Sequence, residues 1–132
     1  MQEPLGTPDS PITAVLFDMD NTLFDFVGAT IAACNAVNRR LGLDRGQDLL
    51  FSFLRHDGRD FEDVRHIRDF MVDNAVFSED LFAECCIIYE EAKIRNLTPY
   101  PHSRETLQEL REQGFFLSVV TDASFENAVI RL

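Results

Sequence analysis

This sequence of 132 residues contains a single lysine, Lys93, and few basic residues overall. With 12 basic residues against 23 acidic ones, its formal net charge is −11. Such a chain lacks a basic surface that would attract the phosphates of a nucleic acid or the headgroups of an anionic membrane. Nor does any segment approach the roughly 20 consecutive apolar residues of a membrane-spanning helix. We therefore expect neither a nucleic-acid partner nor a membrane partner.

Cysteine is also scarce. The three cysteines, Cys34, Cys85 and Cys86, are odd in number and two are adjacent, which is typical of a reduced compartment rather than a disulfide framework. We interpret them as thiols that fill a hydrophobic core. Residues 1–11 lack the basic start and apolar centre of a signal peptide, and their prolines and glycine predict a flexible tail. The sequence thus favours a cytoplasmic location.

What the chain does contain is an apolar run directly followed by carboxylates. Residues 14–17 are Ala-Val-Leu-Phe, and Asp18, Asp20 and Thr22 come next. A run of β-formers before turn residues predicts a fully buried strand, and open α/β sheets bind ligands beyond the carboxyl ends of such strands. Because side chains alternate along an extended chain, Asp18 and Asp20 should point the same way, toward one pocket.

Two carboxylates in one pocket suit a nucleophile and a proton donor. An ionised aspartate can attack phosphorus, while a second carboxyl can protonate the leaving oxygen and later activate water. Carboxylates also attract Mg²⁺, which prefers oxygen ligands. The alternative is a chance Asp-x-Asp-x-Thr in an aspartate-rich chain.

Between this segment and residue 98, apolar residues recur at helical spacing. We expect a helix with apolar residues at helical spacing from Val27 to Leu41 that stops at Gly42, and further helices that begin near Asp48, Asp60 and Ser78. Together they predict a small helical bundle.

The last part of the chain returns to an α/β pattern. Residues 103–113 predict a helix, and residues 115–120 predict a second parallel strand that ends at Thr121 and Asp122. Ser124 is expected to cap a final helix. The whole reads as a βαβα pattern interrupted by a helical insert.

The segment Asp18-Met19-Asp20-Asn21-Thr22 resembles the first motif of the haloacid dehalogenase-like superfamily, Asp-x-Asp-x-Thr after a hydrophobic strand. The run from Phe115 to Thr121 is similar to its second motif, a hydrophobic strand that ends in Thr or Ser. The resemblance implies an α/β fold with a partial Rossmann-like parallel-sheet core at residues 12–24 and 99–132. It also implies an inserted α-helical cap at residues 25–98.

The resemblance further implies a Mg²⁺-dependent phosphate-monoester hydrolase that works through an aspartyl-phosphate. Asp18 would be the nucleophile and Asp20 the general acid and base, and both would hold the metal. Thr121 and the main-chain N–H of Asp122 would bind the phosphate, and Thr22 would support the nucleophile loop. Because dehalogenases of this superfamily need no acid two places after the nucleophile, Asp20 favours a phosphatase. We expect a small phosphorylated metabolite as substrate, as in the capped, phosphoglycolate-phosphatase-like branch.

Two further motifs of the superfamily, a lysine and a late acidic pair, normally follow the second one. Residues 122–132 contain no lysine. The chain therefore resembles the front half of such an enzyme, truncated after the second motif. The alternative is a non-catalytic remnant, or one piece of a split protein that acts as a binding or interaction module. In either form, an exposed apolar sheet edge would promote self-association.

Overall fold

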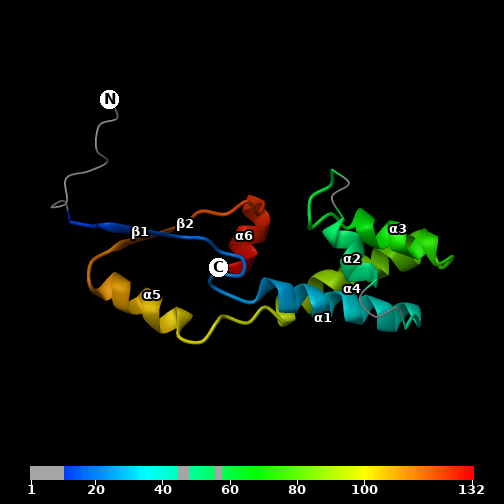
Figure 1. Cartoon of the computed structure of the whole chain (residues 1–132). Coiled ribbons are helices and arrows are strands. Elements are labelled where there is room, and N and C mark those ends of the chain that lie inside the picture. The colour runs from blue at the N-terminus through cyan, green and yellow to red at the C-terminus, as the bar shows by residue number, and fades with distance from the viewer. Residues whose placement is uncertain (1–10, 45–47, 56–57) are drawn as a thin grey trace, which may run out of the picture. The chain divides into compact units, whose positions relative to one another are not determined.

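The computed structural model describes residues 11–44, 48–55 and 58–132, so most of the predicted tail at residues 1–11 lies outside the described part. The chain divides into two compact units. Unit 1 holds the described residues up to Phe24 with residues 99–130 and 132, and unit 2 holds the described residues of 25–98 with residue 131. The elements in chain order (Figure 1) are β1 (Ala14–Phe17), α1 (Phe26–Leu41), α2 (Asp48–Leu54), α3 (Arg65–Asp73), α4 (Glu79–Arg95), α5 (Ser103–Glu112), β2 (Phe116–Val119) and α6 (Phe125–Arg131).

Unit 1 is built on a parallel pair of strands. β1 and β2 pair in register, from Ala14 opposite Phe116 to Phe17 opposite Val119. Parallel strands need a long crossover connection, and here unit 2 and α5 lie between them in the sequence. The predicted α/β class, a parallel sheet interrupted by a helical insert, is confirmed.

The prediction of a fully buried first strand is wrong for this structure. Exposure alternates along both strands, with Leu16 67% and Phe116 79% exposed and Val15 and Phe17 half-buried. In parallel strands, paired residues point to the same side of the sheet, and α5 packs against β2. One face is therefore partly covered, whereas the face with Leu16 and Phe116 is open to solvent.

Unit 2 has a hydrophobic core of its own. Helices α1 and α4 pack along each other, while α2 and α3 contact one another and the α1–α4 pair. At the centre, the rings of Phe53 and Tyr89 stack with their centroids 5.0 Å apart. The predicted helical spacing thus produces the expected bundle. Its fully enclosed core consists of Ala33, Cys34, Val37, Leu49, Leu50, Phe53, Ile67, Phe70, Met71, Cys85, Tyr89 and Ala92.

The helix ends follow local signals in most places. Gly42 ends α1 in the left-handed conformation at φ 65°, and Ser78 caps α4 by accepting a hydrogen bond from the N–H of Leu81. The helix expected from Asp60 begins instead at Arg65, so that prediction is wrong. Asp63 accepts hydrogen bonds from the main-chain N–H and the guanidinium of Arg65, which holds the preceding residues in turns. The same guanidinium lowers the pKa of Asp63 to about 2.

The described cysteines are free thiols, and two of them belong to the core of unit 2. Cys34 and Cys85 are buried, as interpreted from the sequence, and Cys86 is half-buried. Burial raises the pKa of the Cys34 thiol to about 12, so this side chain stays neutral near pH 7. In the described part of the chain, no helix is both long enough and apolar enough to cross a membrane.

At the start of α1, Asp25 and Gly28 provide a testable pair of substitutions. Asp25 caps the helix by accepting the N–H of Gly28 at 2.8 Å, and its loss should lower the free energy of unfolding by about 1 kcal/mol. Gly28→Ala should also destabilise the chain, although alanine usually favours helices, because its Cβ would lie 2.3 Å from Oδ2 of Asp25. Removal of the Asp25 carboxylate removes this steric clash.

We therefore expect Gly28→Ala to be destabilising in the parent but neutral or stabilising in an Asp25→Ala background. Urea denaturation of the four proteins, followed by circular dichroism, measures both effects. An equal loss of stability in the two backgrounds would contradict the predicted clash.

Candidate active site

The chain turns sharply after β1. The N–H groups of Thr22 and Leu23 both donate to the carbonyl of Met19, at 3.2 and 2.9 Å, and the N–H of Asn21 donates to the carbonyl of Phe24 at 3.0 Å. Asn21 has φ 60°, in the left-handed region that asparagine tolerates better than most residues. This loop presents the predicted first-motif residues on a hydrogen-bonded backbone.

The candidate nucleophile stands at the entrance to that loop. Asp18 is exposed and Asp20 half-buried, while Met19 between them is fully buried. This alternation agrees with two carboxylates on one side of the chain and an apolar anchor on the other. The hydroxyl of Thr22 donates to Oδ2 of Asp18 at 2.7 Å and so orients that carboxylate. No sequence pattern specified this hydrogen bond, although Thr22 was expected to support the loop.

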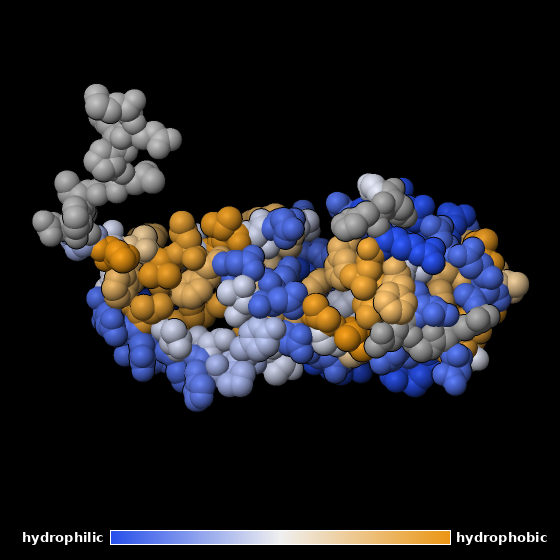
Figure 2. Space-filling model, in the orientation of Figure 1, coloured by the Kyte–Doolittle hydropathy of each residue, from blue (hydrophilic) through white to orange (hydrophobic). Residues whose placement is uncertain are grey.

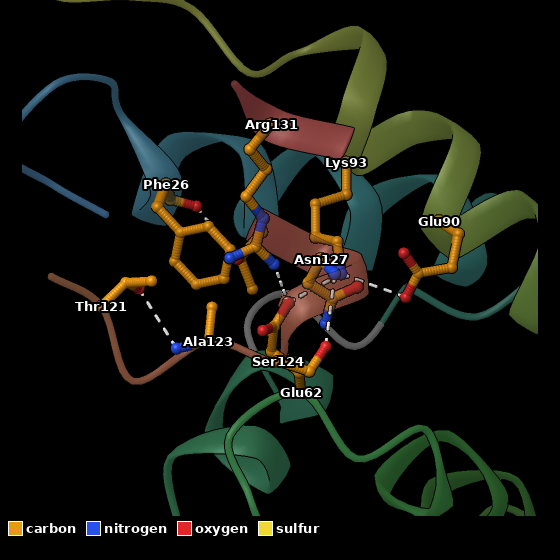
Figure 3. Close-up of polar contacts among 10 residues, drawn as sticks. Phe26, Glu62, Glu90, Lys93, Thr121, Ala123, Ser124, Asn127 and Arg131 are labelled. Atoms are coloured by element: carbon orange, nitrogen blue, oxygen red, sulfur yellow. Dashed lines mark hydrogen bonds and ion pairs between the residues drawn. The ribbon is translucent and has the colours of Figure 1, made fainter. Parts of the chain in front are cut away.

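The second predicted motif follows the neighbouring strand. The N–H of Val120 donates to the carbonyl of Phe17 at 2.8 Å, so the two strands stay paired up to the residues before Asp18 and Thr121. Thr121 Oγ1 accepts the N–H of Ala123 at 3.1 Å (Figure 3). As this hydroxyl accepts from the backbone, its own hydrogen can be donated elsewhere. Asp122, next in the chain, is exposed.

These positions bring the two motifs to one edge of the sheet. The carboxyl ends of adjacent parallel strands lie side by side, and Asp18 follows one of them while Thr121 follows the other by two residues. The carboxylate oxygens of Asp18, which can act as a nucleophile, and the hydroxyl of Thr121, which can donate a hydrogen bond, thus lie at the edge at which open α/β sheets bind ligands. The arrangement suits attack on an anionic group held between the two loops.

A cavity of about 480 Å³ opens beside this edge, within unit 1. Asn21 and Thr22 line one side, and Tyr100, His102 and Thr106 belong to its wall. Neither Asp18 nor Asp20 lines it. Nothing in the sequence pattern pointed to this cavity.

Asp18 and Asp20 fit the share of a magnesium site that proteins usually contribute. Mg²⁺ is commonly held by one or two carboxylates, with substrate phosphates and waters as the other ligands. In residues 11–44, 48–55 and 58–132, no three or more His, Cys, Asp or Glu side chains gather as a ready metal cluster. The described residues therefore offer a partial oxygen shell rather than a complete one.

Lys93 lies within unit 2 and is engaged there. Its side chain is 4% exposed, and Nζ donates to Glu62 at 3.1 Å and to Glu90 at 3.0 Å (Figure 3). The ammonium also stands over the ring of Tyr89, 5.1 Å from its centroid. Because a buried ammonium is costly unless it is paired, these contacts hold Lys93 in place.

Two parallel strands, each followed by a polar loop at the same sheet edge, define an α/β protein with a candidate ligand site at that edge. Residues 15–132 match the family model described as haloacid dehalogenase-like hydrolase. The chain belongs to this family, as the two motifs implied.

Individual relatives agree with this assignment. The chain is 31% identical over 121 residues to a glyceraldehyde 3-phosphate phosphatase of Methanothermobacter thermautotrophicus, a match that covers 84% of this chain and 52% of that protein. It is 28% identical over 117 residues to a phosphoglycolate phosphatase of Vibrio vulnificus, covering 84% and 50%. The chain spans about half the length of the curated relatives it matches.

A solved structure supports the fold. The crystal structure of a predicted phosphoglycolate phosphatase from Haemophilus somnus superposes with a TM-score of 0.58 at 23% identity. The superposition covers 88% of this chain and 54% of that one. The order of strands and helices described here is thus also found in an experimentally determined fold.

Proposed function

We propose that this chain supplies the nucleophile half of a Mg²⁺-dependent phosphate-monoester hydrolase. The observation that carries the proposal is the placement of Asp18 and Thr121 after two adjacent strands paired in register, with Thr22 orienting the Asp18 carboxylate. Unit 1 would be part of the catalytic core and unit 2 the helical cap. Family membership and the phosphatase relatives support this reading.

In the first step, a carboxylate oxygen of Asp18 attacks the phosphorus of the ester. A bond forms between that oxygen and phosphorus, and the bond from phosphorus to the leaving oxygen breaks. Asp20, in its acid form, gives its proton to the leaving oxygen, so the alcohol departs neutral. The Thr121 hydroxyl and the N–H of Asp122 donate hydrogen bonds to phosphate oxygens.

In the second step, Asp20 is a carboxylate and takes a proton from water. That water attacks the phosphorus of the aspartyl-phosphate, the bond to the Asp18 oxygen breaks, and inorganic phosphate leaves. Asp18 and Asp20 would hold Mg²⁺ through a carboxylate oxygen and a main-chain carbonyl, respectively. When bound, this cation supplies positive charge that offsets the repulsion between carboxylates and phosphate.

The names of the relatives support a substrate class. Glyceraldehyde 3-phosphate and phosphoglycolate, which name them, are small phosphate esters. We propose a small phosphorylated metabolite, hydrolysed in the cytoplasm. The free thiols of the described chain are compatible with that compartment.

The role of Asp20 can be tested through the leaving group. The assay uses a chimaera that joins residues 1–132 to the part of the Methanothermobacter relative outside the match. Asp20→Asn should lower kcat/KM for an alkyl ester such as phosphoglycolate by about 10²-fold or more, because an alkoxide leaves poorly unless protonated. For p-nitrophenyl phosphate, whose phenolate leaves without a proton, the loss should be much smaller.

Asn21→Asp is the matched control, since it changes the neighbouring loop position without removing the proposed acid. It should affect both substrates alike. Equal losses for the two substrates with Asp20→Asn would contradict general acid catalysis by this residue. Absence of Mg²⁺-dependent hydrolysis in a folded chimaera would contradict the proposed function itself.

A further inference from the structure

The cavity of unit 1 has the dimensions of a small-molecule site. Its volume of about 480 Å³ falls within the roughly 300–1,000 Å³ of ligand pockets. The loop after β1 forms one wall, and the segment that leads into α5 forms another. The N–H of Tyr100 holds these walls together by donating to the carbonyl of Leu23 at 3.0 Å. All the described residues that line the cavity belong to unit 1.

The lining is polar but carries no fixed charge. Among the described residues that line the cavity, none is Asp, Glu, Lys or Arg. Hydroxyl and amide groups both donate and accept hydrogen bonds, and a neutral imidazole does the same. The side chains of these kinds in the walls are Asn21, Thr22, Tyr100, His102, Ser103 and Thr106. The cavity therefore suits a ligand with many neutral hydrogen-bonding groups.

Apolar side chains also belong to the walls. Phe17 and Leu107 are half-buried there, and Leu23 is buried. Figure 2 shows surface of intermediate hydropathy, drawn pale, around the segment that enters α5, between the hydrophilic surface of α5 and the hydrophobic strands. A ligand of this cavity therefore needs C–H surface as well as hydrogen-bonding groups.

The backbone has an uncommon conformation on both sides of the cavity. In the described chain, the non-glycine residues with positive φ are Asn21, Ala75 and His102, and the first and last of them line the cavity. The left-handed region is costly for a residue with a Cβ, and such residues concentrate at ligand-binding segments. His102 also begins α5 without a side-chain cap hydrogen bond. An imidazole at a position where glycine would be less strained indicates a role in binding.

We propose that this cavity binds an uncharged polyhydroxylated molecule, a monosaccharide or a polyol. The hydroxyl groups of this ligand bond with Tyr100, His102 and Thr106. Its C–H groups pack on Phe17 and Leu107. An anionic ligand is disfavoured here, because the chain has a net charge of −11 and the described lining contains no Lys or Arg. The ligand has two sources, a free sugar and the sugar portion of a phosphate ester.

Thr22 links the cavity to the candidate nucleophile. It lines the cavity, and its hydroxyl donates to Oδ2 of Asp18 at 2.7 Å. A hydroxyl oxygen that donates its hydrogen can still accept another, so a sugar hydroxyl can bond to Thr22 without breaking the bond to Asp18. Neither Asp18 nor Asp20 lines the cavity, so binding does not depend on the catalytic roles proposed for them.

The test follows the amide signals of the intact 132-residue chain in ¹H–¹⁵N NMR spectra. The uncharged probes are D-ribose, D-glucose and sorbitol, and the charged probes are D-glucose 6-phosphate and inorganic phosphate. If the source is a free sugar, at least one uncharged probe should give saturable shifts in the amides of residues 21–23 and 102–107. If the source is a phosphate ester, D-glucose 6-phosphate alone should give these shifts, and the amides that follow β2 should shift as well. Inorganic phosphate alone should leave the amides of the cavity unshifted.

Two substitutions separate binding from folding. Thr106→Val keeps the shape of the side chain but removes its hydroxyl, so it should raise the dissociation constant of the binding probe about two- to tenfold. Thr13→Val is the matched control, since Thr13 is exposed in unit 1 and does not line the cavity, and it should leave this constant unchanged. His102→Gly relieves a positive φ of 66°, so it should raise the melting temperature by a few degrees and yet weaken binding. A residue with a merely structural role would not change stability and affinity in opposite directions.

Three results would overturn the proposal. The first is that no sugar, charged or uncharged, shifts the amides of the cavity. The second is that inorganic phosphate alone reproduces the shifts, which would make the cavity an anion site. The third is that Thr106→Val and His102→Gly both leave the affinity at the level of the Thr13→Val control. Circular dichroism of each variant shows that its helices are kept, which separates a loss of binding from a loss of fold.

Discussion

Asp18→Asn is expected to remove nearly all hydrolysis of an aryl phosphate by the chimaera with the Methanothermobacter relative. The amide of asparagine has the shape of the carboxylate but is a far weaker nucleophile, so the first bond to phosphorus cannot form at a useful rate. Its oxygen can still accept the hydrogen bond that Thr22 now donates to Asp18 at 2.7 Å, which keeps the loop intact. Retained activity above roughly a tenth of the parent rate would contradict the assignment.

A second readout separates chemistry from folding. The proposed intermediate is an acyl phosphate on Asp18, which survives acid and is cleaved by hydroxylamine. After rapid acid quenching of the parent with a radiolabelled phosphate ester, label should remain on the peptide that contains Asp18, and none should remain on Asp18→Asn. Thr22→Val is the control that removes the orienting hydroxyl but keeps the nucleophile. It should slow labelling without abolishing it.

Much of the fold could be predicted because its signals are local. Gly42 ends α1 through a left-handed conformation, and Ser78 and Ser124 cap their helices with side-chain hydrogen bonds. Each signal depends only on residues within one helical turn. The parallel pairing of the strands was also predictable, because two apolar runs on either side of helical segments favour an α/β sheet.

Burial could not be predicted in the same way. The run Ala-Val-Leu-Phe reads as a buried strand, yet Leu16 is exposed because burial depends on elements far away in sequence. The predicted start of α3 was wrong for a related reason, since the side-chain contacts of Asp63 with Arg65 compete with the hydrogen bonds of the helical backbone. Sequence periodicity cannot show which of two local hydrogen-bonding arrangements is the more stable.

The candidate site was predictable in its residues but not in its details. Alternation along the strand predicted Asp18 and Asp20 on one side, and the buried Met19 agrees with this. The assignment of catalytic roles to these residues stays a prediction. The cavity near Tyr100 and His102 depends on how the segment before α5 meets the loop after β1, where the N–H of Tyr100 donates to the carbonyl of Leu23 at 3.0 Å. No spacing in the sequence encodes that contact.

The 132-residue chain by itself is expected to show no Mg²⁺-dependent phosphatase activity above that of its own Asp18→Asn variant. Two motifs can provide a nucleophile and one side of a phosphate cradle, but residues 122–132 contain no lysine to stabilise charge on the transferring group. Lys93 cannot take that role while Nζ is buried against Glu62 and Glu90 in unit 2. Losing one such electrostatic donor typically costs about 10²–10³ in rate.

The measurement compares the two proteins side by side at saturating Mg²⁺, with p-nitrophenyl phosphate and phosphoglycolate as substrates. A clear difference between the two proteins would mean that the described residues, or a second copy of the chain, complete the site. The dependence of the rate on protein concentration distinguishes these two cases, since only an assembled site becomes more active per molecule as the concentration rises.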